Sequence, residues 1–311
     1  MGRELGIMGD CYIDGFPAWL ETVMRHGFTW IGVNGTSITD AQRIERSLKA
    51  IEASGIKRAS FHAVASLVPA DPADRGPHLE RMKRDIDMAA MFGCPVAVFH
   101  YRSVQLKSGG WRGAAYDSAA FLLREGLSEF DKRMAENVAT ICEYAKGQGV
   151  GVALENLMYP YTRRTADIVA FIEQLGLDNL GVCFDTGHAH AAERDVAADL
   201  LAAAEHLTAV HFHDNFGANR DQLVPDADLH LAPGLGTIPW PAVIQALDQT
   251  VYKGPAVFEG ITENKLLGDL DLEAHLQLTI ANWRMYETLA ERIPDCFSFA
   301  DRPRTAGAGR A

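Results

Sequence analysis

The sequence predicts a single-domain α/β protein with the (β/α)8 TIM-barrel fold. Three observations support this prediction: eight short apolar segments recur along the 311 residues, longer amphipathic segments separate them, and most apolar segments are continuous rather than alternating. Continuous runs of Val, Ile, Phe and Ala are typical of parallel strands that are covered on both faces. Eight strand-then-helix units in a chain of this length match the size of such a barrel.

The predicted strands occupy residues 5–12, 29–34, 58–63, 96–101, 151–157, 181–185, 209–213 and 256–260. The clearest helix covers residues 128–146, where apolar residues recur about every 3.6 positions and Ser128 with Asp131 predicts a capping pair. The other predicted helices cover residues 165–175, 191–205, 241–249 and 272–293. An open doubly wound sheet is the alternative fold, but it rarely has eight strands, and no G-x-G-x-x-G motif follows the first strand.

We expect the barrel to occupy residues 1–297 and a disordered tail, polar and rich in small residues, to occupy residues 298–311. Two long connections interrupt the strand–helix rhythm. The first, at about residues 102–127, has Trp111 at its glycine-rich tip and is long enough to cover a pocket mouth. The second, residues 215–240, carries Asp228 and His230.

Composition restricts the class of protein. The formal net charge of −12 gives no electrostatic help in binding nucleic acid. The N-terminal residues do not resemble a signal peptide and no apolar run is long enough to span a membrane, so a cytoplasmic location is expected. The five cysteines have no C-x-x-C spacing, which argues against a disulfide framework or a cysteine-rich zinc site, and Cys183 is expected to be an inert core thiol.

Nine histidine and acidic residues lie at or just beyond the ends of six apolar segments. They are His62, His100, Glu155, Asp185, His188, His211, Asp228, His230 and Glu259. In a TIM barrel the carboxyl ends of the strands form the active-site face, and a charge at the end of a core strand needs a partner. Singly, each residue could pair with a neighbour or cap local backbone. Together they predict a metal site.

Imidazole and carboxylate ligands together favour Mn²⁺ or Zn²⁺, with Mg²⁺, Co²⁺ or Fe²⁺ as alternatives, over Ca²⁺, which prefers oxygen throughout. Four of the nine residues come from four different strands and are expected to converge on one ion: Glu155, Asp185, His211 and Glu259. His190 and His213 are expected to support neighbouring ligands or to lie at the surface. Four further histidines are expected to be solvated: His26, His78, His206 and His275.

The segments VALEN, FDTGHAH, VHFHDN, H-L-x-P-G-x-G-x-I-x-W and VFEG resemble the xylose isomerase-like TIM-barrel superfamily, which includes sugar-phosphate isomerases and epimerases, inosose dehydratase-like enzymes and endonuclease IV. For an isomerase or epimerase, the resemblance implies a single ion held by the four residues above and an enediolate mechanism in which Glu155 and Glu259 move the proton. His188, Arg220 and Trp111 are then expected to contact the substrate. One departure is that Gly217 stands where the epimerases often have an arginine.

Endonuclease IV implies a larger set of ligands, and all nine residues match it. By resemblance, a first zinc is held by His62, His100 and Glu155. Glu155 also bridges to a second zinc held with Asp185, His211 and Glu259, and a third zinc is held by His188, Asp228 and His230. The five residues beyond the four-residue set can instead contact sugar hydroxyls. One to three ions per chain are therefore expected.

We expect a metal-dependent isomerase or epimerase that acts on a sugar, sugar phosphate or cyclitol. A trinuclear phosphoesterase is the first alternative, and a lyase, a dehydratase or a non-catalytic barrel subunit is the second. A small sugar-like molecule is the expected partner, without nucleic acid or membrane, and the chain is expected to form a homo-oligomer.

Overall fold

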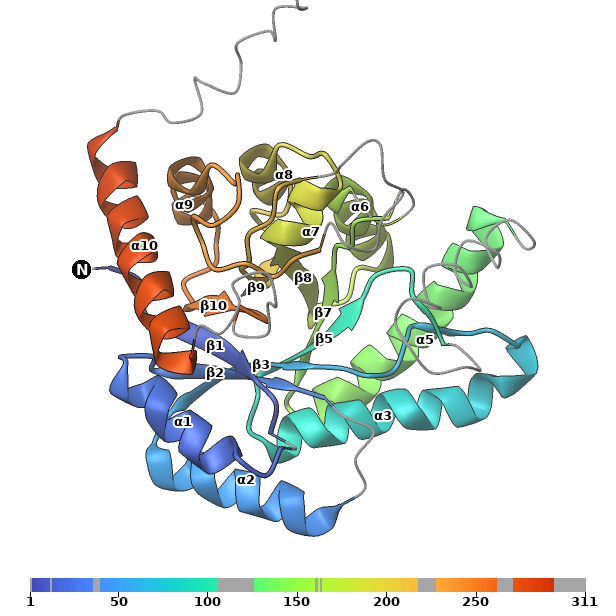
Figure 1. The fold of residues 1–311 in the computed structure, drawn as a ribbon. Coiled ribbons are helices and arrows are strands. Elements are labelled where there is room, and N and C mark those ends of the chain that lie inside the picture. The colour runs from blue at the N-terminus through green and yellow to red at the C-terminus, as the bar shows by residue number, and fades with distance from the viewer. Residues whose placement is uncertain are drawn as a thin grey trace, which may run out of the picture.

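Eight parallel strands form the centre of the computed structural model, which describes residues 2–11, 13–35, 40–105, 126–159, 162, 164–217, 228–261 and 271–293 (Figure 1). Their order around the sheet is β10-β1-β2-β3-β5-β7-β8-β9. They are β1 (Leu5–Gly9), β2 (Trp30–Asn34), β3 (Lys57–His62), β5 (Val96–His100), β7 (Gly151–Glu155), β8 (Leu180–Asp185), β9 (Leu207–His211) and β10 (Ala256–Phe258). Two short strands, β4 (Val68–Pro69) and β6 (Val104–Gln105), pair separately.

The two edges of the sheet meet and nearly close a barrel. On one side β10 pairs with β1 in parallel register, with Ile7 opposite Phe258. On the other side Phe212, just past β9, donates its N–H to the carbonyl of Val257 at 2.8 Å and accepts the N–H of Glu259 at 3.2 Å. The prediction of a single-domain (β/α)8 TIM barrel is confirmed.

Helices surround the strands (Figure 1). They are α1 (Phe16–Arg25), α2 (Ala41–Ser54), α3 (Arg75–Met91), α5 (Leu127–Gly147), α6 (Thr165–Leu175), α7 (Thr186–Ala191), α8 (Val196–Ala202), α9 (Trp240–Asp248) and α10 (Leu272–Arg292), with a 3-10 turn, η1 (Pro72–Asp74). Among the described helices, none combines the length and apolar character that crossing a membrane requires. The predicted tail, residues 298–311, lies outside the described residues.

Two local predictions about helices are wrong. The expected helix over residues 191–205 is divided, because Glu193 has a φ of 58° and Asp195 accepts a hydrogen bond from the N–H of Ala198, which begins α8 anew. The predicted cap at Ser128 is also wrong. The helix begins at Leu127 after Gly126, so Ser128 lies inside its first turn and no side-chain cap forms.

Residues of the central strands alternate between the outer core and the barrel interior. Outward side chains pack under the helices, whereas four small inward residues, Val98, Ala153, Cys183 and Ala209, form a separate apolar cluster inside the barrel. Each of these four lies two residues before the last residue of its strand, so the strand-end side chain points to the same interior. The inner cluster is therefore the floor beneath the strand-end residues.

Burial corrects one prediction about histidines and agrees with the expectation for Cys183. His78 on α3 and His275 on α10 were expected to be solvated, but both are buried, because each lies on the helix face that packs against the core. Cys183 is fully buried, and burial raises the pKa of its thiol to about 12, which makes it a poor nucleophile.

Candidate metal centre

Five strands end on an ionisable residue that points into the barrel mouth. These residues are His62 of β3, His100 of β5, Glu155 of β7, Asp185 of β8 and His211 of β9. Glu259 follows the last residue of β10. Because all the strands are parallel, their carboxyl ends meet at one face of the barrel, and the sequence thereby brings six donors to one place.

Glu155 is at the centre of this first cluster. Its Oε1 lies 3.0 Å from Nδ1 of His211, and its Oε2 lies 3.2 Å from Nε2 of His62 and 3.5 Å from Nε2 of His100. The same His211 nitrogen lies 2.8 Å from Oε2 of Glu259. Glu155 and His211 are completely buried, so the cluster is shielded from bulk water at its base.

Two buried polar atoms of the first cluster have no hydrogen-bond partner: Asp185 Oδ2 and His211 Nε2. Burying a polar atom without a partner is costly, and a carboxylate more so. Donor atoms of Glu155, Asp185, His211 and Glu259 lie within 4.8 Å of one another, as do those of His62, Glu155 and His211. The described residues therefore fit a divalent cation with mixed nitrogen and oxygen ligands.

The two glutamates and His100 have protonation states that suit ligands of a cation, whereas the neighbouring carboxylates raise the pKa values of His211 and His62, whose protons a bound ion would displace. Burial opposes ionisation of Glu155, but the imidazoles of His211 and His62 outweigh burial and hold the pKa of Glu155 well below its usual range. Burial likewise opposes ionisation of Glu259, and His211 again outweighs it, so the pKa of Glu259 is lowered. Both glutamates are thus ionised at neutral pH. Burial lowers the pKa of His100 to about 4, which leaves its imidazole neutral and able to bind a metal.

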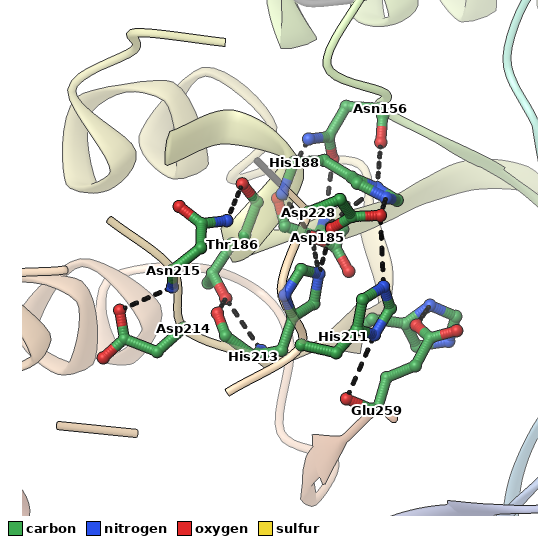
Figure 2. Close-up of polar contacts among 12 residues, drawn as sticks. Asn156, Asp185, Thr186, His188, His211, His213, Asp214, Asn215, Asp228 and Glu259 are labelled. Atoms are coloured by element: carbon green, nitrogen blue, oxygen red, sulfur yellow. Dashed lines mark hydrogen bonds and ion pairs between the residues drawn. The ribbon is translucent and has the colours of Figure 1, made fainter. Parts of the chain in front are cut away.

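A second cluster lies beside the first and contains His188, Asp228 and His230; Figure 2 labels the first two of these. Oδ2 of Asp228 lies 3.4 Å from Nε2 of His188 and 3.2 Å from Nε2 of His230. Nδ1 of His188 lies 2.9 Å from the backbone carbonyl of Asn156 and donates a hydrogen bond to it. That bond leaves Nε2 of His188, which faces Asp228, as the ring nitrogen that would bind an ion.

His213 joins the second cluster, although the sequence left its role open between supporting a ligand and lying at the surface. It is completely buried, and its Nε2 lies 3.0 Å from Oδ1 of Asp185 and 3.5 Å from Oδ1 of Asp228. Its ring stacks on that of His230, with centroids 3.9 Å apart and planes 2° from parallel. A ligated ion lies near the plane of its imidazole, so an ion in the plane of one of these stacked rings lies outside the plane of the other. A donor atom of His213 lies within 4.8 Å of those of His188, Asp228 and His230, so His213 either holds His230 in place or is itself a fourth candidate ligand.

The backbone around β8 positions both clusters. Asn156 donates from Nδ2 to the carbonyl of Asp185 at 2.9 Å and accepts the N–H of Asp185 at 2.8 Å. Oδ1 of Asp185 accepts the N–H of His188 at 2.7 Å, which begins α7. A Cβ atom at Gly187 would lie 1.9 Å from Cε1 of His213, so only glycine leaves room for that ring.

The structure brings all nine predicted residues together in the two clusters; Figure 2 labels Asp185, His188, His211, Asp228 and Glu259 among them. Arg220 and Trp111, the two predicted substrate contacts outside this set, lie outside the described residues.

His190 lies apart from the cation donors and bonds through Nε2 to the hydroxyl of Thr237 at 2.8 Å. The signal for His213 was its spacing: it stands two residues after His211, where a strand that continues straight returns to the same face.

A comparison with known families matches residues 20–281 to the model described as "Xylose isomerase-like TIM barrel". The chain belongs to this family. Relatives of several activities share the fold, and they include sugar epimerases, an inosose dehydratase and an endonuclease. Family membership therefore agrees with the strand-end clusters and leaves the reaction open.

Three relatives illustrate this range. A ketose 3-epimerase of Arthrobacter globiformis is 28% identical over 43% of this chain and 43% of its own length. L-ribulose-5-phosphate 3-epimerase UlaE of Shigella flexneri is 24% identical over 81% of this chain and 82% of its own length. A probable endonuclease 4 of Acholeplasma laidlawii is 24% identical over 61% of this chain and 62% of its own length.

Among solved structures, the IOLI protein with a binding zinc atom superposes with a TM-score of 0.69 at 16% identity, and the alignment covers 94% of this chain and 99% of the IOLI chain. At this level of identity the likeness shows the shared fold. A member of the same fold thus carries zinc.

Proposed function

We propose that the chain is a divalent-metal-dependent isomerase or epimerase that acts on a sugar, sugar phosphate or cyclitol by moving a proton next to a carbonyl group. The observation that supports this most directly is the buried set of Glu155, Asp185, His211 and Glu259, whose donor atoms lie within 4.8 Å of one another. The named activities of the epimerase relatives support the same reaction class.

A divalent cation in this set would act as a Lewis acid that polarises the substrate carbonyl and favours the enediolate, a stabilisation of several kcal/mol. Mn²⁺ or Zn²⁺ fits the mixed donors best, with Mg²⁺, Co²⁺ or Fe²⁺ as alternatives. Arg220 and Trp111 remain proposed substrate contacts. The small-molecule substrate, the homo-oligomer and the cytoplasmic location remain predictions from the sequence.

The two glutamates carry the proton transfer in this proposal. Both reach Nδ1 of His211, Glu155 through Oε1 at 3.0 Å and Glu259 through Oε2 at 2.8 Å. One carboxylate takes the proton from the carbon beside the carbonyl. The other, also ionised in the resting site, takes up a proton from water and delivers it to the opposite face. Exchange with water then restores both glutamates, so the net reaction consumes no proton.

Solvent exchange tests this assignment. The wild-type chain, loaded with Mn²⁺, is incubated with D-psicose or L-ribulose 5-phosphate in deuterium oxide, and deuterium at carbon is measured by mass spectrometry. We expect Glu259→Gln to abolish incorporation while it still binds a metal, because an amide cannot accept the carbon proton. Glu273→Gln is the matched control, since Glu273 is exposed and pairs with Arg25 at 2.6 Å. Undiminished exchange in Glu259→Gln would remove this residue from the mechanism.

A second candidate function is a multinuclear phosphoesterase, and the second cluster favours it. An isomerase with one ion needs only the first cluster, whereas His188, Asp228 and His230 converge on a second set of donors. Two or three ions could together activate a water molecule and bind a phosphoester. The net charge of −12 argues against nucleic acid as the substrate and leaves small phosphoesters.

His230→Ala distinguishes the two functions. If the second cluster holds an ion, the variant should contain one fewer zinc ion per chain, and any hydrolysis of bis(4-nitrophenyl) phosphate should be lost with it. If His230 contacts a sugar, the metal content should stay constant while the KM for the sugar rises. His206→Ala, on a partly exposed histidine near Glu173, serves as the control.

A further inference from the structure

Asp214 is a buried carboxylate close to the cation clusters that takes no part in them. It follows β9, and its side chain points away from His211, His213 and Asp185 (Figure 2). It is fully buried, yet it lies outside every group of residues whose donor atoms converge. A buried carboxylate needs strong hydrogen bonds, and the partners of Asp214 show what it holds.

Four N–H groups donate to this carboxylate. Oδ1 accepts from the backbone N–H of Asn215 at 2.9 Å and of Ile238 at 3.2 Å. Oδ2 accepts from the backbone N–H of Gly234 at 2.8 Å and from Nε1 of Trp240 at 2.9 Å. Three of these donors belong to the segment 228–240, in which the described part of the chain resumes after residue 217.

The backbone of Asp214 holds the same segment. Its N–H donates to the carbonyl of Leu231 at 2.7 Å, and it accepts the N–H of Leu231 at 2.8 Å. Leu231 directly follows His230, which has a φ of 45°, a left-handed conformation that is unfavourable for a residue other than glycine. Such a conformation persists only where the surrounding structure enforces it. The bridge to Asp214 provides that constraint one residue away.

Close packing shows that the segment follows the carboxylate tightly. A Cβ atom at Gly236 would lie 2.3 Å from Oδ1 of Asp214 and 2.2 Å from the carbonyl oxygen of Asn215. Trp240 starts α9 and packs its ring against Phe212 in the core, so the segment is fixed at its far end. Within the segment 228–240, Asp228 and His230 are the only described residues whose donor atoms belong to the cation clusters.

We propose that Asp214 is a positioning residue that holds the segment 228–240 on the barrel so that Asp228 and His230 complete the second cluster. The zinc-binding part of the test below rests on the proposed cation site, whereas the hydrogen-exchange part does not. The carboxylate is required because its two oxygens each accept two N–H groups. An asparagine offers a single acceptor oxygen, and its NH₂ group would face N–H donors that cannot bond to it.

The test compares full-length, metal-free wild type with Asp214→Asn by hydrogen exchange and by zinc titration. Exchange of the Gly234 amide should be at least about tenfold faster in the variant, because its bond to a charged acceptor is lost. The Leu231 amide, which donates to the backbone carbonyl of Asp214, should also exchange faster because the segment is held less firmly. Exchange in β7 (Gly151–Glu155) should stay unchanged. Asp248→Asn is the control: Asp248 is exposed and pairs with Arg3 at 2.9 Å.

Zinc titration gives the functional readout. The zinc site of the second cluster is identified as the site that His230→Ala abolishes. Asp214→Asn should weaken the zinc affinity of this site at least about tenfold, as is typical when residues that orient a ligand are replaced. The first-cluster affinity should stay within about twofold, which a general loss of folding would not allow. Should Asp214→Asn fail to fold, Trp240→Phe removes a single donor and should raise exchange at Leu231 about threefold.

Unchanged exchange at Leu231 in both variants overturns the proposal whatever the zinc result. Equal weakening of both classes of zinc site also overturns it, because Asp214 would then act on the fold as a whole. Absence of isomerase activity with every sugar would leave both readouts intact, so failure of the proposed function and failure of this inference are distinguishable.

Discussion

Replacing Asp85 with asparagine should flatten the pH dependence of stability. Asp85 lies on α3, and one of its carboxylate oxygens accepts the backbone N–H groups of Val64 and Ala65 at 3.1 and 2.8 Å. These bonds fix the turn that follows His62 at the barrel mouth. Burial outweighs them and raises the pKa of Asp85 to about 6.

The sign and size of the effect follow from this pKa. The ordinary value is 3.8, so the folded protein holds the Asp85 proton more tightly than the unfolded chain does. The resulting stabilisation is fully present below the unfolded pKa and is lost as the pH rises through about 6. At about 1.4 kcal/mol for each pKa unit, the full contribution is about 3 kcal/mol, of which about 2 kcal/mol is lost between pH of about 4.5 and 7.5.

Urea unfolding of metal-free wild type and Asp85→Asn at these two pH values measures the difference directly. An asparagine whose oxygen takes the accepting position keeps both hydrogen bonds and cannot ionise. The free energy of unfolding of the variant, relative to wild type, should therefore rise by about 2 kcal/mol from the lower to the higher pH. Asp87→Asn removes a charge from the same helix, where Asp87 accepts the Tyr144 hydroxyl, and is the control. Parallel pH profiles for wild type and Asp85→Asn would refute the reasoning.

Two further predictions concern residues that hold the candidate ligands in place. Gly187→Ala should lower the free energy of unfolding by about 1–3 kcal/mol, because the added methyl group would overlap the His213 ring. Urea unfolding checks this, and a free energy of unfolding equal to that of wild type would mean that the ring moves freely. Asn156→Ala should lower the free energy of unfolding by about 1–3 kcal/mol, because the N–H of Asp185 loses its partner. It should also weaken metal binding about 10- to 100-fold. Calorimetric titration with zinc checks the second effect, and an unchanged affinity would show that Asp185 needs no such support.

The barrel and the main cation donors could be predicted from the sequence because both follow from local patterns. Apolar runs predicted the strands, and the ionisable residues at the ends of six of these runs predicted which face of the barrel holds the candidate site. The alternation of side chains explains the outcome: Ala153 and Glu155, or Cys183 and Asp185, lie on one side of a strand. Parallel strands then bring such ends together without any further information.

Other features depend on contacts between distant segments, and the sequence alone does not specify them. The route of the segment 228–240 depends on the carboxylate of Asp214, whose neighbours come from 20 to 26 residues farther along the chain. The division of the helix after His190 depends on the positive φ of Glu193, a residue that commonly occurs within helices. Burial of His78 and His275 depends on which face of each helix meets the core.

The metal content of the purified chain tests the central claim most directly. The claim is that the strand-end residues around Glu155 form a divalent cation site. After incubation with Mn²⁺ or Zn²⁺ and dialysis, mass spectrometry of the metal should find at least one ion per chain in wild type. Asp185→Asn combined with Glu155→Gln should contain none at the first cluster, while circular dichroism shows an intact fold. A wild-type chain that cannot be loaded with any divalent metal would contradict the account.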